Sequence, residues 1–316
     1  MKKLTYRIRN WKEYNKALIQ RGSLTLWFSE DSVQKWHSCP CTGTKGHPQI
    51  YSDDAILCAL LVRSVYHLPL RALVGFLLSI VTLLTLSITI PSYTQICRRA
   101  KALKKNLAKL SNRRPTDLVF DSTGLKVYGE GEWKVRQHGK SKRRTWRKLH
   151  IAMDPKTQEI ILSELTLNSV GDAEIGADLL KKAPNSVKAV YGDGAYDKLS
   201  FREEIENKGA VPIIPPPKNA TVHRETEGAL KKRDDAVLEI LGFGGDEEGR
   251  KIWKKLKGYH TRSLVETTMY RFKQILDGTL RSREYERQCT EAYIKCLVLN
   301  KMTQLGMPKG SWKAAF

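Results

Sequence analysis

Apolar and polar positions along this chain follow two different periods, which divide it into a helical first part and a mixed second part. In residues 55–65 and 93–110 apolar side chains recur at the three-to-four-residue spacing of an amphipathic helix, and Asp53 and Asp54 stand where the first helix begins. Short apolar runs bounded by turn residues then predict strands at 118–128, 149–153, 159–167, 187–191 and 211–214, with helices at 173–182 and 200–208.

This order of strands and helices is that of an RNase H-like α/β fold, in which helices flank a mixed sheet. The turn residues at 154–157 predict that the first three strands are consecutive and antiparallel. Prolines at 215–217 end this pattern, and the polar run that follows has little apolar periodicity, so we expect a mobile insertion at about 215–257. Residues 242–245 are expected to be a loop in it, and residues 289–305 a closing helix.

The charge balance narrows the class of partner. The 316 residues include 55 Lys plus Arg against 33 Asp plus Glu, and the formal net charge is +22. Such a surplus indicates a polyanion, with nucleic acid favoured and an anionic membrane surface as the alternative. Six cysteines are too few for a disulfide scaffold in a chain of this length, and no signal peptide pattern precedes them, so we expect a cytoplasmic protein.

One apolar segment is almost long enough to cross a membrane. Residues 72–90 contain no charged side chain and approach the roughly 20 residues of a membrane span. Gly75 and several Ser and Thr residues interrupt the segment, and β-branched residues crowd its end. We therefore expect two shorter buried helices joined by a turn, and no membrane partner.

The segments at 70–78 and 92–101 are compatible with a helix-turn-helix whose second helix lies on DNA through Arg98 and Arg99. A basic solvated helix explains the same residues. The expected division is an N-terminal irregular arm at 1–50, a helical DNA-binding region at 51–114 and an RNase H-like domain at 115–316.

The arm contains a set of residues that could hold a structural zinc ion, namely His37, Cys39, Cys41 and His47. The two cysteines are separated by Pro40 alone, which is tighter than the usual gap of about two to four residues. This spacing disfavours zinc.

Four side chains with polar functional groups fall on one face of a predicted helix. Arg262, Glu266 and Lys273 follow Tyr259 by 3, 7 and 14 residues, which places the four side chains within an arc of roughly 60°. A carboxylate among a phenol and two cations suits a metal-dependent enzyme that acts on nucleic-acid phosphates, because cations orient phosphate and the carboxylate holds metal. A solvated charged face with incidental pairing is the alternative.

Two further acids can join Glu266. Asp121 lies at the end of the first strand's apolar run and Asp193 follows the fourth strand, and these strands are neighbours in an RNase H-like sheet. Three close carboxylates repel one another, and divalent cations remove that cost. Two Mg²⁺ ions about 4 Å apart can activate a water or a 3′-hydroxyl for attack on a phosphodiester. Alternatively, Asp121 caps a turn, Asp193 makes an Asx-turn, and Asp197 competes for its role.

A basic run lies between the first two strands and next to these acids, which favours contact with the DNA backbone over a merely solvated charged stretch. It contains Trp146 and the cations Lys140, Lys142, Arg143, Arg144, Arg147 and Lys148.

The spacing Y-(2)-R-(3)-E-(6)-K at Tyr259, Arg262, Glu266 and Lys273 resembles the signature of DDE transposases of bacterial insertion sequences. With the sequences at 119–124, 146–150 and 192–197, the chain resembles the insertion sequence five family from about residue 51 to its last helix.

The resemblance implies an RNase H-like catalytic domain in which Asp121, Asp193 and Glu266 are the catalytic and metal-binding residues. It also implies two Mg²⁺ ions, for which Mn²⁺ can substitute, while Tyr259, Arg262 and Lys273 hold the terminal DNA. The implied partners are double-stranded DNA, as terminal inverted repeats and as target, and a second protomer in the paired-end complex, with the protein on the bacterial nucleoid when DNA is bound. Two other functions stay open: a sequence-specific DNA-binding regulator without catalysis, and an RNase H-like nuclease that cuts without joining.

Overall fold

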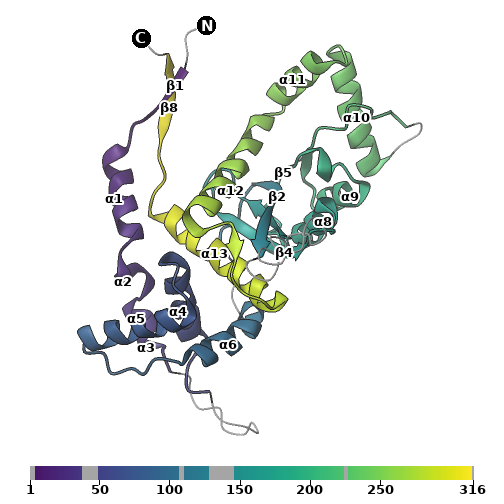
Figure 1. Cartoon of the computed structure of the whole chain (residues 1–316). Coiled ribbons are helices and arrows are strands. Elements are labelled where there is room, and N and C mark those ends of the chain that lie inside the picture. The colour runs from purple at the N-terminus through teal and green to yellow at the C-terminus, as the bar shows by residue number, and fades with distance from the viewer. Residues whose placement is uncertain (1–3, 38–48, 107–109, 128–145, 224–226, 315–316) are drawn as a thin grey trace, which may run out of the picture. The chain divides into compact units, whose positions relative to one another are not determined.

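The computed structural model describes residues 4–37, 49–106, 110–127, 146–223 and 227–314 (Figure 1). The chain divides into two compact units. The first combines Met1–Leu107 with Leu297–Phe316, and the second is Ala108–Cys296.

The first unit is mainly helical. Strand β1 (Leu4–Ile8) pairs antiparallel with β8 (Gly310–Ala314), so segments from opposite ends of the sequence lie side by side (Figure 1). The helices are α1 (Trp11–Arg21), α2 (Leu24–Trp27), α3 (Glu30–Gln34), α4 (Asp53–Val65), α5 (Leu70–Leu83) and α6 (Tyr93–Asn106).

The expectation of an irregular arm over residues 1–50 is wrong for the described part of that segment, which contains β1 and three helices. Aromatic side chains explain the difference. Trp27 and Trp36 are fully buried, and the Trp36 indole N–H donates to the Thr89 carbonyl oxygen at 2.7 Å. A few large rings spread through basic sequence thus supply a core without a regular apolar period.

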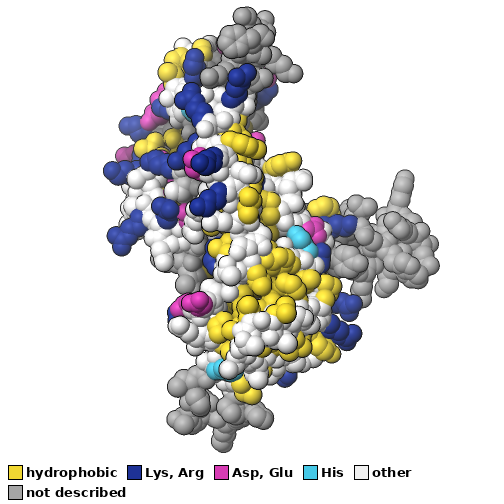
Figure 2. Space-filling model, turned by 90° about the vertical axis from the view of Figure 1, so that its left-hand side faces the viewer, with side chains coloured by type: hydrophobic (Ala, Val, Ile, Leu, Met, Phe, Trp, Pro, Cys, Tyr) yellow, Lys and Arg dark blue, Asp and Glu magenta, His cyan; other side chains and the backbone are white. Residues whose placement is uncertain are grey.

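The apolar segment at 72–90 forms most of one helix, α5, followed by a turn and by residues without regular secondary structure, so the expectation of two short helices is wrong. No single helix among the described residues is long and apolar enough to cross a membrane; only α4 and α5 taken together meet that test, with a bend of 108° between them. Three apolar side chains near the end of α5 are exposed, Leu78, Leu83 and Leu84. Figure 2, which faces this side, shows hydrophobic side chains gathered there.

Helices α5 and α6 are joined by residues 84–92. This connection is longer than the roughly three to four residues of a helix-turn-helix. Helices α5 and α6 therefore lack the short turn of a helix-turn-helix, and DNA binding by this region stays a prediction.

The second unit is built on a six-stranded mixed sheet with the order β4-β3-β2-β5-β6, and β7 also pairs with β2. The first three strands are antiparallel, whereas β5 is parallel to both β2 and β6. This arrangement confirms the RNase H-like sheet. The strands are β2 (Asp117–Val127), β3 (Trp146–Met153), β4 (Ile160–Leu167), β5 (Ala189–Tyr191), β6 (Val211–Ile213) and β7 (Thr279–Leu280).

Helices cover both faces of this sheet. On one face, α8 (Asp172–Lys182) and α9 (Leu199–Asn207) share a buried apolar cluster with Phe120 of β2 and Val190 of β5. On the other, α12 (Ser263–Leu276) packs on β2, and its Thr268 hydroxyl donates to the sulfur of Met153 at 2.9 Å. The last helix, α13 (Tyr285–Leu305), begins in this unit and ends in the first.

The described residues of 215–257 include two helices, α10 (Gly228–Gly242) and α11 (Glu247–Leu256), so the expectation that regular structure ends at the prolines is wrong. Their buried residues pack with strand residues into a small separate core of Ile213, Ala236, Ile240 and Trp253. The apolar period is weak because one buried position of α10 is Ala236 and another is the charged Asp234. Residues 242–245 connect the two helices, as the sequence predicts.

Candidate active site

Asp121 and Asp193 occupy equivalent places on neighbouring parallel strands. Val119 of β2 pairs with Tyr191 of β5, and each acid lies two residues further along its own chain. Side chains alternate between the faces of a sheet, so a shared offset of two residues directs both carboxylates to the face that α12 covers. Asp121 lies within β2, and Asp193 lies just past the end of β5.

Arg262 and Glu266 reach this face from the start of α12. Gly258 adopts a left-handed backbone conformation with φ of 65°, after which a 3₁₀ turn (Tyr259–Arg262) leads into the helix. The expected helical face is therefore present, although its first turn is tighter than an α-helix. The buried face of α12 consists of Val265, Thr268, Met269, Phe272 and Leu276.

The three acids converge on the guanidinium of Arg262. Its Nη2 lies 3.5 Å from Asp121 Oδ2 and 3.5 Å from Asp193 Oδ2, while Nη1 lies 2.5 Å from Glu266 Oε1. Side-chain exposure rises from 16% for Asp121 to 38% for Asp193 and 58% for Glu266. Residues far apart in sequence thus form one acidic cluster, with Asp121 at its buried end and Glu266 at its solvent edge.

The cluster has an excess of negative charge. Burial raises the pKa of Asp121, and the Asp193 and Glu266 carboxylates raise it further. The backbone N–H of Ser122 and the Arg262 guanidinium lower it. Acids on three sides raise the pKa of Arg262, overcoming the opposite effect of its burial. One cation therefore stabilises three carboxylates.

Backbone groups orient two of the acids. The Ser122 N–H donates to Asp121 Oδ1 at 2.8 Å, and the Ala195 N–H donates to Asp193 Oδ1 at 2.9 Å. In each aspartate the second oxygen, Oδ2, is the one that faces Arg262. The Asx-turn expected as an alternative role for Asp193 is present, and it coexists with the contact to Arg262.

Tyr259 lies in the 3₁₀ turn before α12, and Lys273 lies within α12. Burial raises the pKa of Tyr259 to about 12, with Arg262 lowering it and the acids raising it. The Lys254 ammonium lies 5.3 Å from the centre of the Tyr259 ring. Lys273 is exposed, further along α12. The phenol is thus close enough to Arg262 and the acids for their charges to shift its pKa, whereas Lys273 lies further along the helix.

Asp197, which competed with Asp193 in the sequence, has a different role in the structure. Its side chain is only 1% exposed and is paired with Arg202 and Arg233. It is therefore Asp193, and not Asp197, that lies with Asp121 and Glu266.

In the part of the chain that the structure describes, no group of three His, Cys, Asp or Glu side chains is placed to hold a metal ion. In the acidic cluster, the Arg262 guanidinium lies where the three carboxylates converge and so occupies the place of a metal ion. Cys39, Cys41 and His47 fall outside the described residues.

The cations of the basic run that are described have partners within the protein. Arg147 Nε donates to Gln288 Oε1 at 2.9 Å, and Lys148 Nζ donates to the Val170 carbonyl at 3.0 Å and lies 3.3 Å from Asp172 Oδ1. Their contact with DNA stays a prediction. Lys140, Lys142, Arg143 and Arg144 lie outside the described residues.

Arg98 and Arg99 lie on α6 in the first unit. Arg98 is exposed, whereas Arg99 donates to the Tyr51 carbonyl and pairs with Asp53 at 2.5 Å. Both arginines line a hollow of about 550 Å³. Arg99 therefore stabilises the start of α4, and DNA binding by either residue stays a prediction.

The sequence interpretation missed two features. It gave Arg262 a role on DNA, with pairing to Glu266 as the alternative, and did not predict that the same guanidinium reaches both aspartates. It also passed over His150, a buried residue of β3 that lies 2.9 Å from Thr166 Oγ1 and 3.4 Å from Asp172 Oδ1. A polar residue in an otherwise apolar strand end was the available signal.

Comparison with known proteins shows the family to which the chain belongs. Residues 112–301 match a family model described as a transposase DDE domain, and residues 19–130 match a second model with the same description. The chain belongs to the DDE transposase family. The transposase is also similar to the solved structure of a piggyBac transposase synaptic complex with hairpin DNA. That similarity has a TM-score of 0.42 and 10% sequence identity, and covers 95% of this chain and 76% of the other.

The transposase is accordingly an enzyme that cleaves DNA and transfers DNA strands. DDE transposases are generally dependent on divalent metal ions. The narrower resemblance to the insertion sequence five family stays a prediction.

Proposed function

We propose that Asp121, Asp193 and Glu266 are the catalytic carboxylates of the transposase and that they hold its metal ions. The observation that carries this proposal is their convergence on the Arg262 guanidinium, at 3.5 Å, 3.5 Å and 2.5 Å. Because the three carboxylates already meet at one cation, a small rearrangement would let them meet at a metal ion.

The residues present fit Mg²⁺. The donor set consists of oxygen atoms, which hard divalent cations prefer. Three carboxylates face one guanidinium, and the pKa of Asp121 is raised first by burial and further by the Asp193 and Glu266 carboxylates. We infer two Mg²⁺ ions, with Mn²⁺ as a substitute, held by Asp121, Asp193 and Glu266. When bound, such ions lower the pKa of an attacking water or 3′-hydroxyl and stabilise the leaving oxygen.

The protein's own residues have separate tasks in this proposal. Asp121 is the fixed member, because it lies in β2 opposite Ile151 of β3. With metal bound to the carboxylates, Arg262 would be available to a phosphate oxygen, and Tyr259 and Lys273 would hold the terminal DNA beside it. Guanidinium and ammonium groups are the usual partners of phosphate oxygens, which supports this assignment.

The reaction is proposed to occur at the terminal inverted repeats of an insertion sequence. Water attacks the phosphodiester at the element's end, and the bond to the 3′ oxygen breaks to leave a free 3′-hydroxyl. That hydroxyl then attacks a phosphodiester of target DNA, so one bond forms and one breaks. Synapsis of two ends requires a second protomer, and the net charge of +22 suits two DNA partners.

The test uses full-length protein, Mg²⁺ and a duplex that carries the element's end. Asp121→Asn is expected to abolish cleavage while leaving end binding intact. Asp178→Asn is the matched control, because Asp178 lies on the surface of α8 in a 56%-exposed pair with Lys181. Cleavage retained by Asp121→Asn would falsify the assignment.

The same assay separates the two other functions. A regulator binds the end with steep salt dependence and shows no metal-stimulated nicking by the unaltered protein. A nuclease cuts but does not join. Supplied with pre-cut ends that carry a free 3′-hydroxyl, only a transposase produces joined molecules.

A further inference from the structure

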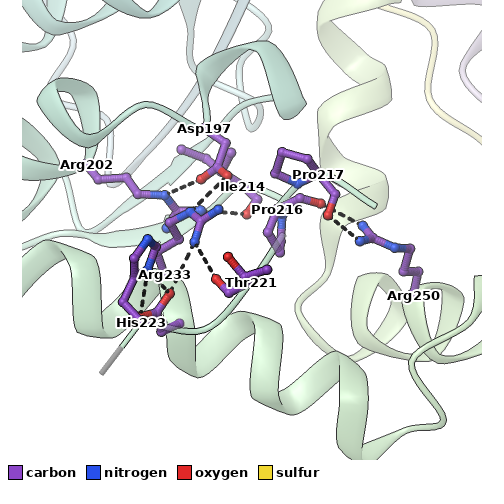
Figure 3. Close-up of polar contacts among 10 residues, drawn as sticks. Asp197, Arg202, Ile214, Pro216, Pro217, Thr221, His223, Arg233 and Arg250 are labelled. Atoms are coloured by element: carbon purple, nitrogen blue, oxygen red, sulfur yellow. Dashed lines mark hydrogen bonds and ion pairs between the residues drawn. The ribbon is translucent and has the colours of Figure 1, made fainter. Parts of the chain in front are cut away.

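The loop that carries Asp193 ends on a buried carboxylate with two arginine partners (Figure 3). Arg202 Nε donates to Asp197 Oδ1 at 2.6 Å, and Arg233 Nε donates to Asp197 Oδ2 at 3.2 Å. The Asp197 side chain is 1% exposed. A carboxylate this deeply buried needs such partners, because an isolated buried charge is strongly destabilising.

The two arginines belong to different parts of the fold. Arg202 comes from α9, is itself buried, and also donates through Nη2 to the Ile214 carbonyl at 3.0 Å. Arg233 comes from α10 and donates through Nη1 to the Thr221 carbonyl at 3.3 Å and to Asp234 Oδ1 at 3.2 Å. Asp197 therefore joins the RNase H-like sheet region to the inserted helices.

The inserted helices also contact both segments that lead into the acidic cluster. Tyr191, two residues before Asp193, and Tyr259, three residues before Arg262, pack against the small core around Trp253. The insertion thus fixes the approach to Asp193 from two sides, by apolar packing before it and by an ion pair after it.

The chain between Asp193 and Asp197 is short and tightly packed. Tyr196, in the intervening 3₁₀ turn, is 1% exposed, and its ring lies 5.3 Å from that of Phe201. A displacement of Asp197 is therefore expected to be transmitted to Asp193, because the packed turn between them leaves little room to absorb it. Loss of Arg233 leaves the contact between Arg202 and Asp197 Oδ1 in place, and removes the arginine that contacts Oδ2.

We propose that Arg233 is a positioning residue for the acidic cluster: by holding Asp197 it fixes the loop that places Asp193 against Asp121 and Glu266. This inference rests on the proposed function of the three carboxylates. It assigns the inserted helices a task in the metal site without placing any of their residues in contact with metal or substrate.

A matched control is available within the same insertion. Arg250 of α11 donates to the carbonyls of Pro216 and Pro217 at 2.7 Å and 2.6 Å, and in Figure 3 its polar contacts are with these two prolines and not with Asp197. Arg233→Gln and Arg250→Gln remove the same charge from the same inserted segment. Only the first removes the contact to Asp197.

The experiment titrates full-length protein with MnCl₂ by electron paramagnetic resonance and records the thermal midpoint of each variant. Arg233→Gln is expected to weaken Mn²⁺ binding by roughly tenfold or more, as loss of a residue that orients a metal ligand does. Its affinity for end DNA stays unchanged while the single-turnover cleavage rate falls. Arg250→Gln keeps the Mn²⁺ affinity, and Arg233→Lys, which retains the cation, recovers part of it.

Two results would overturn the inference. One is an Arg233→Gln protein that binds Mn²⁺ as tightly as the unaltered protein. The other is a thermal midpoint lower than that of Arg250→Gln together with no recovery in Arg233→Lys, which indicates general destabilisation. Failure of the proposed function gives a different result, because the Asp193→Asn variant then binds Mn²⁺ as tightly as the unaltered protein. In that case the inference about Arg233 fails as well.

Discussion

The Arg262 guanidinium is bound to the Glu266 carboxylate one helical turn away, at 2.5 Å, while its other nitrogen reaches both aspartates. The position at which a divalent cation would meet all three acids is thus held by a side chain of the protein itself. A metal ion held by these carboxylates, as we propose, would compete with Arg262 for the oxygens that the guanidinium now contacts.

Arg262→Gln is therefore expected to bind Mn²⁺ more tightly in the absence of DNA. Removal of the competing cation leaves the three carboxylates mutually repelled, and a gain of about tenfold corresponds to about 1.4 kcal/mol. The same variant cleaves DNA more slowly, because it lacks a phosphate ligand. Mn²⁺ titration checks the first effect. Arg281→Gln, which alters a partly exposed pair with Asp277, serves as the control, and weaker Mn²⁺ binding by Arg262→Gln contradicts the competition.

Gly192→Ala tests the packing of the loop before Asp193. An added Cβ would lie 3.0 Å from the Tyr196 Cβ and 3.1 Å from its Cγ. Such overpacking costs about 1–3 kcal/mol and is expected to slow cleavage by displacing Asp193. Chemical denaturation measures the first effect. Gly75→Ala, in α5 with nothing within 4 Å, is expected to stabilise instead by about 0.5–1 kcal/mol. Equal effects of the two substitutions speak against the packing argument.

His150 makes stability depend on pH. Burial lowers its pKa to about 4 from the usual 6.5, with Asp172 opposing and Lys148 reinforcing the effect. As pH falls below 6.5 the unfolded chain takes up a proton that the folded protein resists until about pH 4. Stability is therefore lost across that window, by up to about 1.4 kcal/mol per pH unit. The free energy of unfolding of His150→Gln is expected to vary less between pH 6.5 and 4, whereas His260→Gln, at an exposed position, should follow the unaltered protein.

Lys273→Gln tests the proposed DNA face of α12. Replacement of one phosphate-binding lysine is expected to weaken binding of the terminal duplex and to reduce the slope of log affinity against log salt by about one. Fluorescence anisotropy at several salt concentrations measures that slope. Lys251→Gln changes a 70%-exposed lysine paired with Glu248 and provides the comparison. An unchanged slope for Lys273→Gln removes this residue from the DNA contacts.

The sheet and the convergence of the acids were predictable from sequence, because apolar strands such as that around Phe120 fix which segments are neighbours. The inserted helices were not, since their buried positions include Ala236 and Asp234 and leave no clear period. The pairing of Asp197 with Arg233 depends on tertiary contact between segments 36 residues apart. The position of the Arg262 guanidinium depends on side-chain torsions, which apolar patterning does not constrain.

The three acids differ in the stiffness of their supports, and this has a consequence for how the enzyme can adapt. Asp121 sits in a strand that cannot shift without breaking its ladder to β3, whereas Glu266 is 58% exposed at the first turn of a helix. If the bound molecule changes from an uncut end to a target duplex, as we propose, the adjustment is expected on the helical side. The strand serves as the fixed reference against which each new geometry is set.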